Sequence, residues 1–214
     1  MKPFYAFDID GVLADTREIH RLALQERLGV TLYDGGTYAT FGFEHDADEI
    51  MAELEAVGLE VWREVAGEAA ASGGEVVRRL VEEGRLMGYV TRRDVSMYEV
   101  TREWLRKNGY PVATYLLRFA RMGYEHHKDF YRANGVPNPC KSAAIHGWLE
   151  GWREGAPPLS RVVLVEDSPH EAAQAHASGI NVTVIRRPYN RAFEAQCLAA
   201  GVDITFIDSL EELL

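Results

Sequence analysis

The stretch that decides the fold lies near the start of the chain and reads Phe4-Tyr5-Ala6-Phe7-Asp8-Ile9-Asp10-Gly11-Val12. Its apolar run, Phe4 to Ile9, is too short for a helix and is typical of a buried parallel strand. Asp8 and Asp10 stand where this strand ends. Because side chains two residues apart on extended chain project to the same side, both carboxylates are expected to face one centre. Gly11 then permits a sharp turn.

Further short apolar runs, each bounded by turn residues, predict more buried strands. They are Leu86 to Thr91, Val162 to Val165 and Val182 to Ile185, with Thr114 to Leu117 and Ile204 to Ile207 as two additional candidates. Helical periodicity separates them at Gly74 to Glu83, Ser96 to Lys107, Lys141 to Glu150 and His170 to Ala177, and Gly84, Gly109 and Gly179 stand where helices are expected to stop. This alternation predicts an α/β protein with an open, three-layer, Rossmann-like parallel sheet.

Residues 16–73 break the alternation. They are rich in Glu and Ala at helical spacing and are interrupted by the glycine- and aromatic-rich stretch Tyr33 to Phe43. We therefore expect a small helical cap, residues 16–73, inserted after the first strand, and a catalytic core made of residues 1–15 and 74–214. Arg118 to Pro139 shows no clear period and is expected to be loop and short helix.

The composition disfavours two classes of partner, long nucleic acids and acidic membranes. The 214 residues are 47% hydrophobic, with 23 basic and 33 acidic side chains and a formal charge of −10. That charge disfavours long nucleic acids and acidic membranes.

Cys140 and Cys197 show no Cys-x-x-Cys spacing, so they are interpreted as ordinary thiols. With no apolar leader and no run long enough to cross a bilayer, we expect a soluble, cytoplasmic protein.

Polar side chains also follow two other predicted strands. Thr91 ends one of them, and Glu166-Asp167-Ser168 follows another. Ligands of open parallel sheets bind at the carboxyl ends of the strands, so these groups are expected to converge with Asp8 and Asp10. Lys141 begins a predicted helix, where the helix dipole disfavours a cation unless an anion is near. A bound phosphate is such an anion.

The motif Asp8-x-Asp10-Gly11-Val12, then Thr91, Lys141 and Glu166-Asp167, resembles the four ordered motifs of the haloacid dehalogenase superfamily. The resemblance spans residues 4 to about 187, and the predicted cap resembles the helical insert that members of this family carry. A lone Asp-x-Asp would be a weak signal, whereas four matches in order and in the expected strand context are a strong one.

The resemblance implies a role for each matched residue. Asp8 is the expected nucleophile that attacks phosphorus, and Asp10 is the expected general acid and base. Magnesium is the implied cofactor, held by Asp8, Asp167 and the backbone carbonyl of Asp10. Thr91 and Lys141 are expected to bind the phosphoryl group and to act in catalysis. Arg92 is a further expected substrate-binding residue.

Several assignments stay open at this point. Lys128 competes with Lys141 for the role of the cation, and Arg93 competes with Arg92. Glu166 either binds the metal through water or orients its neighbours. The remaining candidates, each with an ordinary structural explanation, are Asp15 and Glu171 as helix caps, His126 and His127 as surface histidines, and Tyr38, Phe41 and Phe43 as cap packing.

Asp10 favours phosphoryl chemistry over dehalogenation, because a halide leaving group needs no proton. Short segments such as Arg187-Pro188-Tyr189-Asn190 resemble pieces of 5′(3′)-deoxyribonucleotidases and polynucleotide 3′-phosphatases. The acidic charge and the cap favour a small phosphorylated metabolite such as a nucleotide. The alternatives are a polynucleotide-end phosphatase, a sugar phosphomutase and a non-catalytic binding module with this fold. A homodimer stays open.

Overall fold

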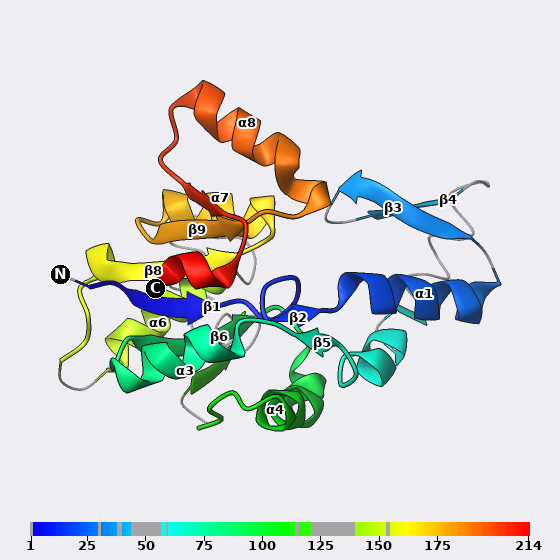
Figure 1. Cartoon of the computed structure of the whole chain (residues 1–214), viewed down its shortest axis with the longest axis horizontal. Helices are drawn as coiled ribbons and strands as arrows, with labels where there is room; N and C mark the ends of the chain where they lie inside the picture. Colours follow the sequence, from blue (N-terminus) through cyan, green and yellow to red (C-terminus); the bar gives the residue numbers. More distant parts are fainter. Residues whose placement is uncertain are drawn as a thin grey trace.

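The computed structural model describes residues 2–29, 31–37, 40–43, 57–58, 60–113, 116–120, 140–152 and 155–214, with side chains left out at 32–43. Its centre is a six-stranded sheet in the order β10-β9-β8-β1-β6-β7, and every neighbouring pair is parallel. The strands are β1 (Phe4–Phe7), β6 (Leu86–Thr91), β7 (Leu117–Phe119), β8 (Val162–Glu166), β9 (Asn181–Ile185) and β10 (Thr205–Ile207). Strand β1 therefore lies between β8 and β6, and its carboxyl end points toward the helix Arg17–Leu28 (Figure 1).

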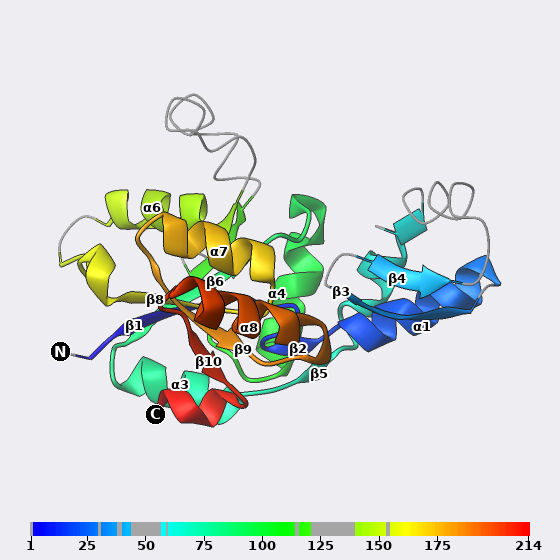
Figure 2. The ribbon, with the colours of Figure 1, turned by 90° about the horizontal axis from the view of Figure 1, so that it is seen from above.

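Helices cover both faces of the sheet, which gives three layers (Figure 2). The helices of one face are α3 (Gly74–Glu82), α4 (Tyr98–Lys107) and the 3₁₀ helix η5 (Leu210–Leu213). The helices of the other face are α6 (Lys141–Glu150), α7 (Pro169–Ala177) and α8 (Arg191–Ala200). Three further 3₁₀ helices are η1 (Val95–Met97), η3 (Leu159–Arg161) and η4 (Pro188–Asn190).

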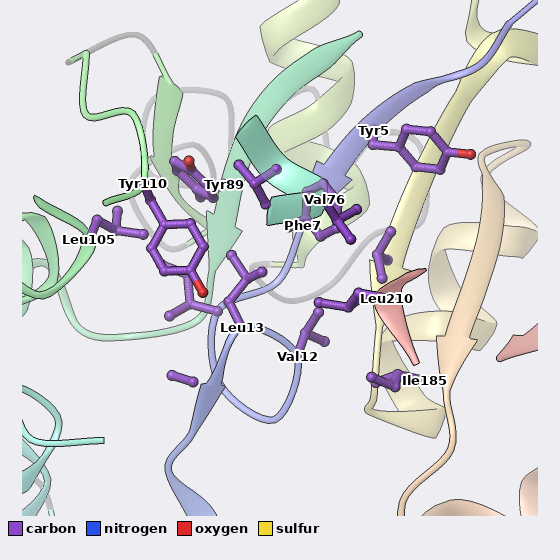
Figure 3. Packing of buried hydrophobic residues seen from close by; sticks show 14 of the residues in the cluster. Tyr5, Phe7, Val12, Leu13, Val76, Tyr89, Leu105, Tyr110, Ile185 and Leu210 are labelled. Carbon is purple, nitrogen blue, oxygen red and sulfur yellow. The ribbon is translucent and has the colours of Figure 1, made fainter. Parts of the chain in front are cut away.

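The core on the α3 side fixes the turn that follows β1. Val12 and Leu13 are fully buried in the same cluster as Phe7 and Val76, and Figure 3 shows their side chains pointing into it. The hydroxyl of Ser72 also donates to the carbonyl of Val12 at 2.9 Å. The turn after Asp10 is thus held by the buried side chains of Val12 and Leu13 and by the hydrogen bond from Ser72.

The predicted α/β fold with its parallel sheet is confirmed, and the predicted stop glycines Gly84, Gly109 and Gly179 all have positive φ. Two details were wrong. The strand expected at Thr114 to Leu117 is β7, which begins at Leu117 and runs to Phe119, into the segment expected to be loop. Helix α8 was not predicted, because its exposed, weakly patterned sequence gives little periodic signal.

Between β1 and α3 the chain leaves the core and returns. Strands β2 (Ala14–Asp15) and β5 (Ala70–Ala71) pair antiparallel where it does so. Beyond them lie α1 (Arg17–Leu28) and an antiparallel hairpin of β3 (Leu32–Thr37) and β4 (Thr40–Phe43), projecting to one side of the sheet (Figure 1). The hairpin occupies the glycine- and aromatic-rich interruption, for which the sequence predicted no strand; the domain limits at 15 and 73 stay predictions.

Both cysteines are buried free thiols. Among the residues described, no helix is long and apolar enough to cross a membrane.

Candidate active site

A buried cluster of one lysine and three acidic side chains lies where β1 and β8 end. Lys141 Nζ is 2.6 Å from Asp8 Oδ2 and donates to Glu166 Oε2 at 2.7 Å. Exposed fractions are 2% for Asp8, 1% for Lys141 and 0% for both Glu166 and Asp167. The single ammonium group therefore bridges two carboxylates in a buried region, where charge interactions are stronger than at the surface.

The acidic groups of this cluster have raised pKa values. Burial raises the pKa of Asp8 well above its ordinary value, and Glu166 and Asp10 add repulsion against the attraction of Lys141. Burial raises the pKa of Glu166 to about 7 and that of Asp167 to about 6, with the neighbouring carboxylates adding to each shift. The cluster holds more negative charge than Lys141 alone offsets.

The same cluster fits a divalent cation. Asp8, Glu166 and Asp167 each offer a carboxylate oxygen, and these oxygens lie within 4.8 Å of one another. Within the described part of the chain, Asp167 Oδ1 is buried and has no hydrogen-bond partner. A buried acceptor without a donor is costly unless a ligand completes it, and oxygen ligands suit Mg²⁺. The Asp10 carboxylate lies outside this trio; its expected contribution was a backbone carbonyl, which stays a prediction.

The other oxygen of Asp167 is held from the loop after β9. The hydroxyl of Tyr189 donates a short hydrogen bond to Asp167 Oδ2, and Asn190 Nδ2 donates to the Asp167 carbonyl at 2.9 Å. Gly11 packs directly against the Asp167 carboxyl with φ of +79°, so an added Cβ would overlap it. Tyr189 and Asn190 belong to a segment that the sequence singled out without giving it a structural role.

Lys141 is fixed through its backbone as well as its side chain. Glu171 Oε2 accepts the Lys141 backbone N–H at 3.0 Å, at the first residue of α6. Glu171 Oε1 accepts from Arg92 Nη1 at 2.8 Å. Glu171 thus caps the helix that carries Lys141, in addition to lying in the first turn of its own helix. The Arg92 side chain is 43% exposed, and its role in substrate binding stays a prediction.

Asp10 has a partner, Arg93, that the sequence offered only as an alternative substrate-binding residue. Arg93 donates to both of its oxygens, from Nε to Oδ2 at 2.9 Å and from Nη2 to Oδ1 at 2.6 Å. Arg92 was the expected substrate-binding residue and Arg93 its alternative, because adjacent residues after a strand give no signal of which one turns inward. The structure buries Arg93 and leaves Arg92 partly exposed.

Thr91 is fully buried at the end of β6, beside β1, and its hydroxyl accepts the Arg93 backbone N–H at 3.1 Å. The structure therefore brings Asp8, Asp10, Thr91, Lys141 and Asp167 to one edge of the sheet. The alternatives Lys128, His126, His127 and Tyr38, and the side chains of Phe41 and Phe43, lie outside the described residues.

Solved structures share this architecture. A HAD family hydrolase from Deinococcus radiodurans with bound phosphate and sodium is 18% identical, with a TM-score of 0.64 over 99% of this chain and 93% of that one. A haloacid dehalogenase-like protein from Agrobacterium tumefaciens is also 18% identical, with a TM-score of 0.63 over 100% and 96%. A putative HAD-hydrolase from Bacillus subtilis, bound to magnesium, is 14% identical, with a TM-score of 0.59 over 100% and 97%.

No family model matches the chain, and no curated protein is similar to it in sequence. The structural likeness nevertheless covers nearly the full length of both chains in each comparison. The chain has the haloacid dehalogenase-like fold, which confirms at the level of fold the resemblance drawn from its four motifs.

Proposed function

We propose that this protein is a magnesium-dependent phosphomonoester hydrolase that works through an aspartyl-phosphate on Asp8. The observation that carries the proposal is the buried bridge from Lys141 to Asp8 and Glu166, beside which Asp167 Oδ1 has no donor among the described residues. A cluster with excess buried negative charge and one fixed cation suits a metal ion and a phosphoryl group, which together complete it.

In this proposal an Asp8 oxygen attacks phosphorus, and the bond from phosphorus to the leaving oxygen breaks. The leaving oxygen takes a proton from the Asp10 carboxyl. Water then attacks phosphorus, Asp10 takes the proton of that water, and the electron pair of the breaking bond returns to the Asp8 carboxylate. Lys141 and Thr91 are the proposed phosphoryl ligands. Mg²⁺, held by Asp8 and Asp167, would offset repulsion between the anionic nucleophile and the anionic substrate.

The proposed substrate is a small phosphorylated metabolite such as a nucleotide. The net charge of −10 opposes a long polynucleotide, and the α1 and hairpin region stands on the side where β1 ends (Figure 1). Support also comes from the Deinococcus structure with bound phosphate and the Bacillus structure bound to magnesium. Arg92, partly exposed at the rim of the cluster, is the proposed contact to the rest of the substrate.

The test is phosphate release from a panel of nucleoside monophosphates, sugar phosphates and p-nitrophenyl phosphate, with Mg²⁺ and with EDTA. We expect release with Mg²⁺ only, and its loss in Asp8→Asn, a near-isosteric change that removes the nucleophile. Asp208→Asn makes the same change at a side chain that is 79% exposed and is the matched control. Activity that persists in Asp8→Asn would refute the mechanism. Isomerised sugar phosphate without free phosphate would favour a phosphomutase.

A further inference from the structure

The carboxylate of Asp10 is held in one orientation by a buried guanidinium. The two hydrogen bonds from Arg93 run to different oxygens, 2.9 Å to Oδ2 and 2.6 Å to Oδ1. The Arg93 side chain has no exposed surface, and that of Asp10 is 16% exposed. Bidentate pairing of this kind fixes the plane of the carboxylate, which a single hydrogen bond does not.

Arg93 is in turn anchored to the core. Its Nη1 donates to Thr101 Oγ1 in α4 at 3.0 Å, and its backbone N–H donates to Thr91. The guanidinium also lies over the ring of Trp62, in the helical residues 60–65, at 5.9 Å from the ring centroid. Thr101 is fully buried. The guanidinium that orients Asp10 is therefore anchored to helix α4 of the core and covered by Trp62, which comes from the region between β1 and α3.

We propose that Arg93 is a positioning residue that orients Asp10 for the second half of the reaction, the hydrolysis of the aspartyl-phosphate. This inference rests on the proposed function. In that step the oxygen of water bonds to phosphorus, the bond from phosphorus to Asp8 breaks with its electron pair returning to the Asp8 carboxylate, and one water proton passes to Asp10.

The geometry suits this step more than the first one. Each carboxylate oxygen has two lone-pair sites, and Arg93 occupies one on each, so a site is left to accept a proton from water. In the first step, a leaving group that is a stable anion needs no proton from Asp10, so the orientation of Asp10 matters less there. The pairing seen here is the arrangement of a base that is ready to accept.

The experiment measures the two half-reactions separately with p-nitrophenyl phosphate, whose leaving group is a stable anion that needs no proton. Rapid mixing gives the rate of the p-nitrophenolate burst, which reports formation of the phosphoenzyme. Decay of acid-precipitable phosphoenzyme after a chase with unlabelled substrate reports its hydrolysis. In Arg93→Lys we expect hydrolysis to slow by about tenfold or more and formation to change by less than about threefold.

Two further variants keep the test decisive if Arg93→Lys folds poorly. Thr101→Val removes one anchor of Arg93 while keeping the size of the side chain, and it should slow hydrolysis in the same direction by a smaller factor. Arg102→Gln, at the next residue of α4, alters a side chain that is 52% exposed and should leave both rates unchanged.

The outcomes separate this inference from the proposed function. Equal slowing of both half-reactions in Arg93→Lys and Thr101→Val would mean that Arg93 only stabilises the fold, and would overturn the inference while the hydrolase remains. Unchanged hydrolysis in both variants would overturn it as well. A wild-type protein that forms no phosphoenzyme and releases no phosphate would instead refute the proposed function.

Discussion

At the scale of single residues, the candidate site depends on one buried cation that two carboxylates share. Lys141 serves two carboxylates at once, and both of its contacts are shorter than 3 Å. Removing one partner of a buried ion pair leaves the other charge unpaired, which costs far more than losing a pair at the surface. Lys141 is therefore expected to matter for stability as well as for binding phosphate.

Lys141→Met should lower the free energy of unfolding by about 3–5 kcal/mol and abolish phosphate release, because Asp8 and Glu166 then face each other without a cation. Lys2→Met removes an ion pair between a side chain 69% exposed and Glu83, and should cost at most about 1 kcal/mol. Urea unfolding of both variants measures the difference. Equal small losses would show that the Lys141 bridge carries little energy.

The sequence predicted the residue types of this site better than their pairings. Asp8, Thr91, Lys141 and Asp167 could be placed because each follows a strand or begins a helix, and strand ends of a parallel sheet converge. The partner of Asp10 could not be predicted, since choosing Arg93 over Arg92 depends on backbone direction after β6. The backbone direction after β6 is decided by three-dimensional packing and leaves no periodic pattern in the sequence.

At the scale of elements, the turn after β1 packs against Asp167, the proposed metal ligand that directly follows β8. Gly11 combines φ of +79° with direct contact to the Asp167 carboxyl and the Tyr189 hydroxyl. Gly29, at the end of α1, has φ of +66° and no neighbour within 4 Å of an added Cβ. The two glycines share a conformation and differ in their surroundings.

Gly29→Ala should cost about 1–2 kcal/mol, the strain of a side chain in the left-handed region. Gly11→Ala should cost more than that and also weaken Mg²⁺ binding, because the new methyl group displaces Asp167. Calorimetric titration of Mg²⁺ into each variant, with urea unfolding, checks both expectations. Mg²⁺ binding to Gly11→Ala with the affinity of the wild type would contradict the claim that this turn positions Asp167 as a metal ligand.

Buried strands and the helices that pack on them were the elements that the sequence predicted well. The run Leu86 to Thr91 and the helix Lys141 to Glu150 have the bounds that were expected. Helix α8 was missed because most of its residues are exposed. Strand β7 was placed too early because the apolar run Tyr115 to Leu117 begins before it and Arg118 interrupts the pattern. The hairpin β3–β4 was missed because glycine-rich sequence gives little strand signal.

At the scale of the whole molecule, the raised carboxyl pKa values couple stability to pH. Glu166 and Asp167 have pKa values of about 7 and about 6, above their ordinary values of 4.5 and 3.8. The folded protein therefore binds more protons than the unfolded chain between about pH 4 and pH 7. Their contribution to stability is fully present below about pH 4 and is lost as the pH rises to about 7.

Between about pH 5 and about pH 7.5, the metal-free wild type should lose free energy of unfolding. Its loss should exceed that of Glu166→Gln, whose amide does not ionise, by on the order of 2–3 kcal/mol. Mg²⁺ binds the folded state and should restore most of this loss at the higher pH. Urea unfolding at both pH values, with EDTA or Mg²⁺, measures it. Identical pH dependence in the two proteins would contradict the assignment of a raised pKa to Glu166.

The most direct test of the central claim is mass spectrometry of the peptide that carries Asp8, after acid quenching during turnover with Mg²⁺. The account predicts one phosphoryl group on Asp8, absent with EDTA, absent in Asp8→Asn and removed by hydroxylamine, which cleaves acyl phosphates. Phosphate release with no phosphoryl group on Asp8 at any quench time, while Asp8→Asn stays active, would contradict the account.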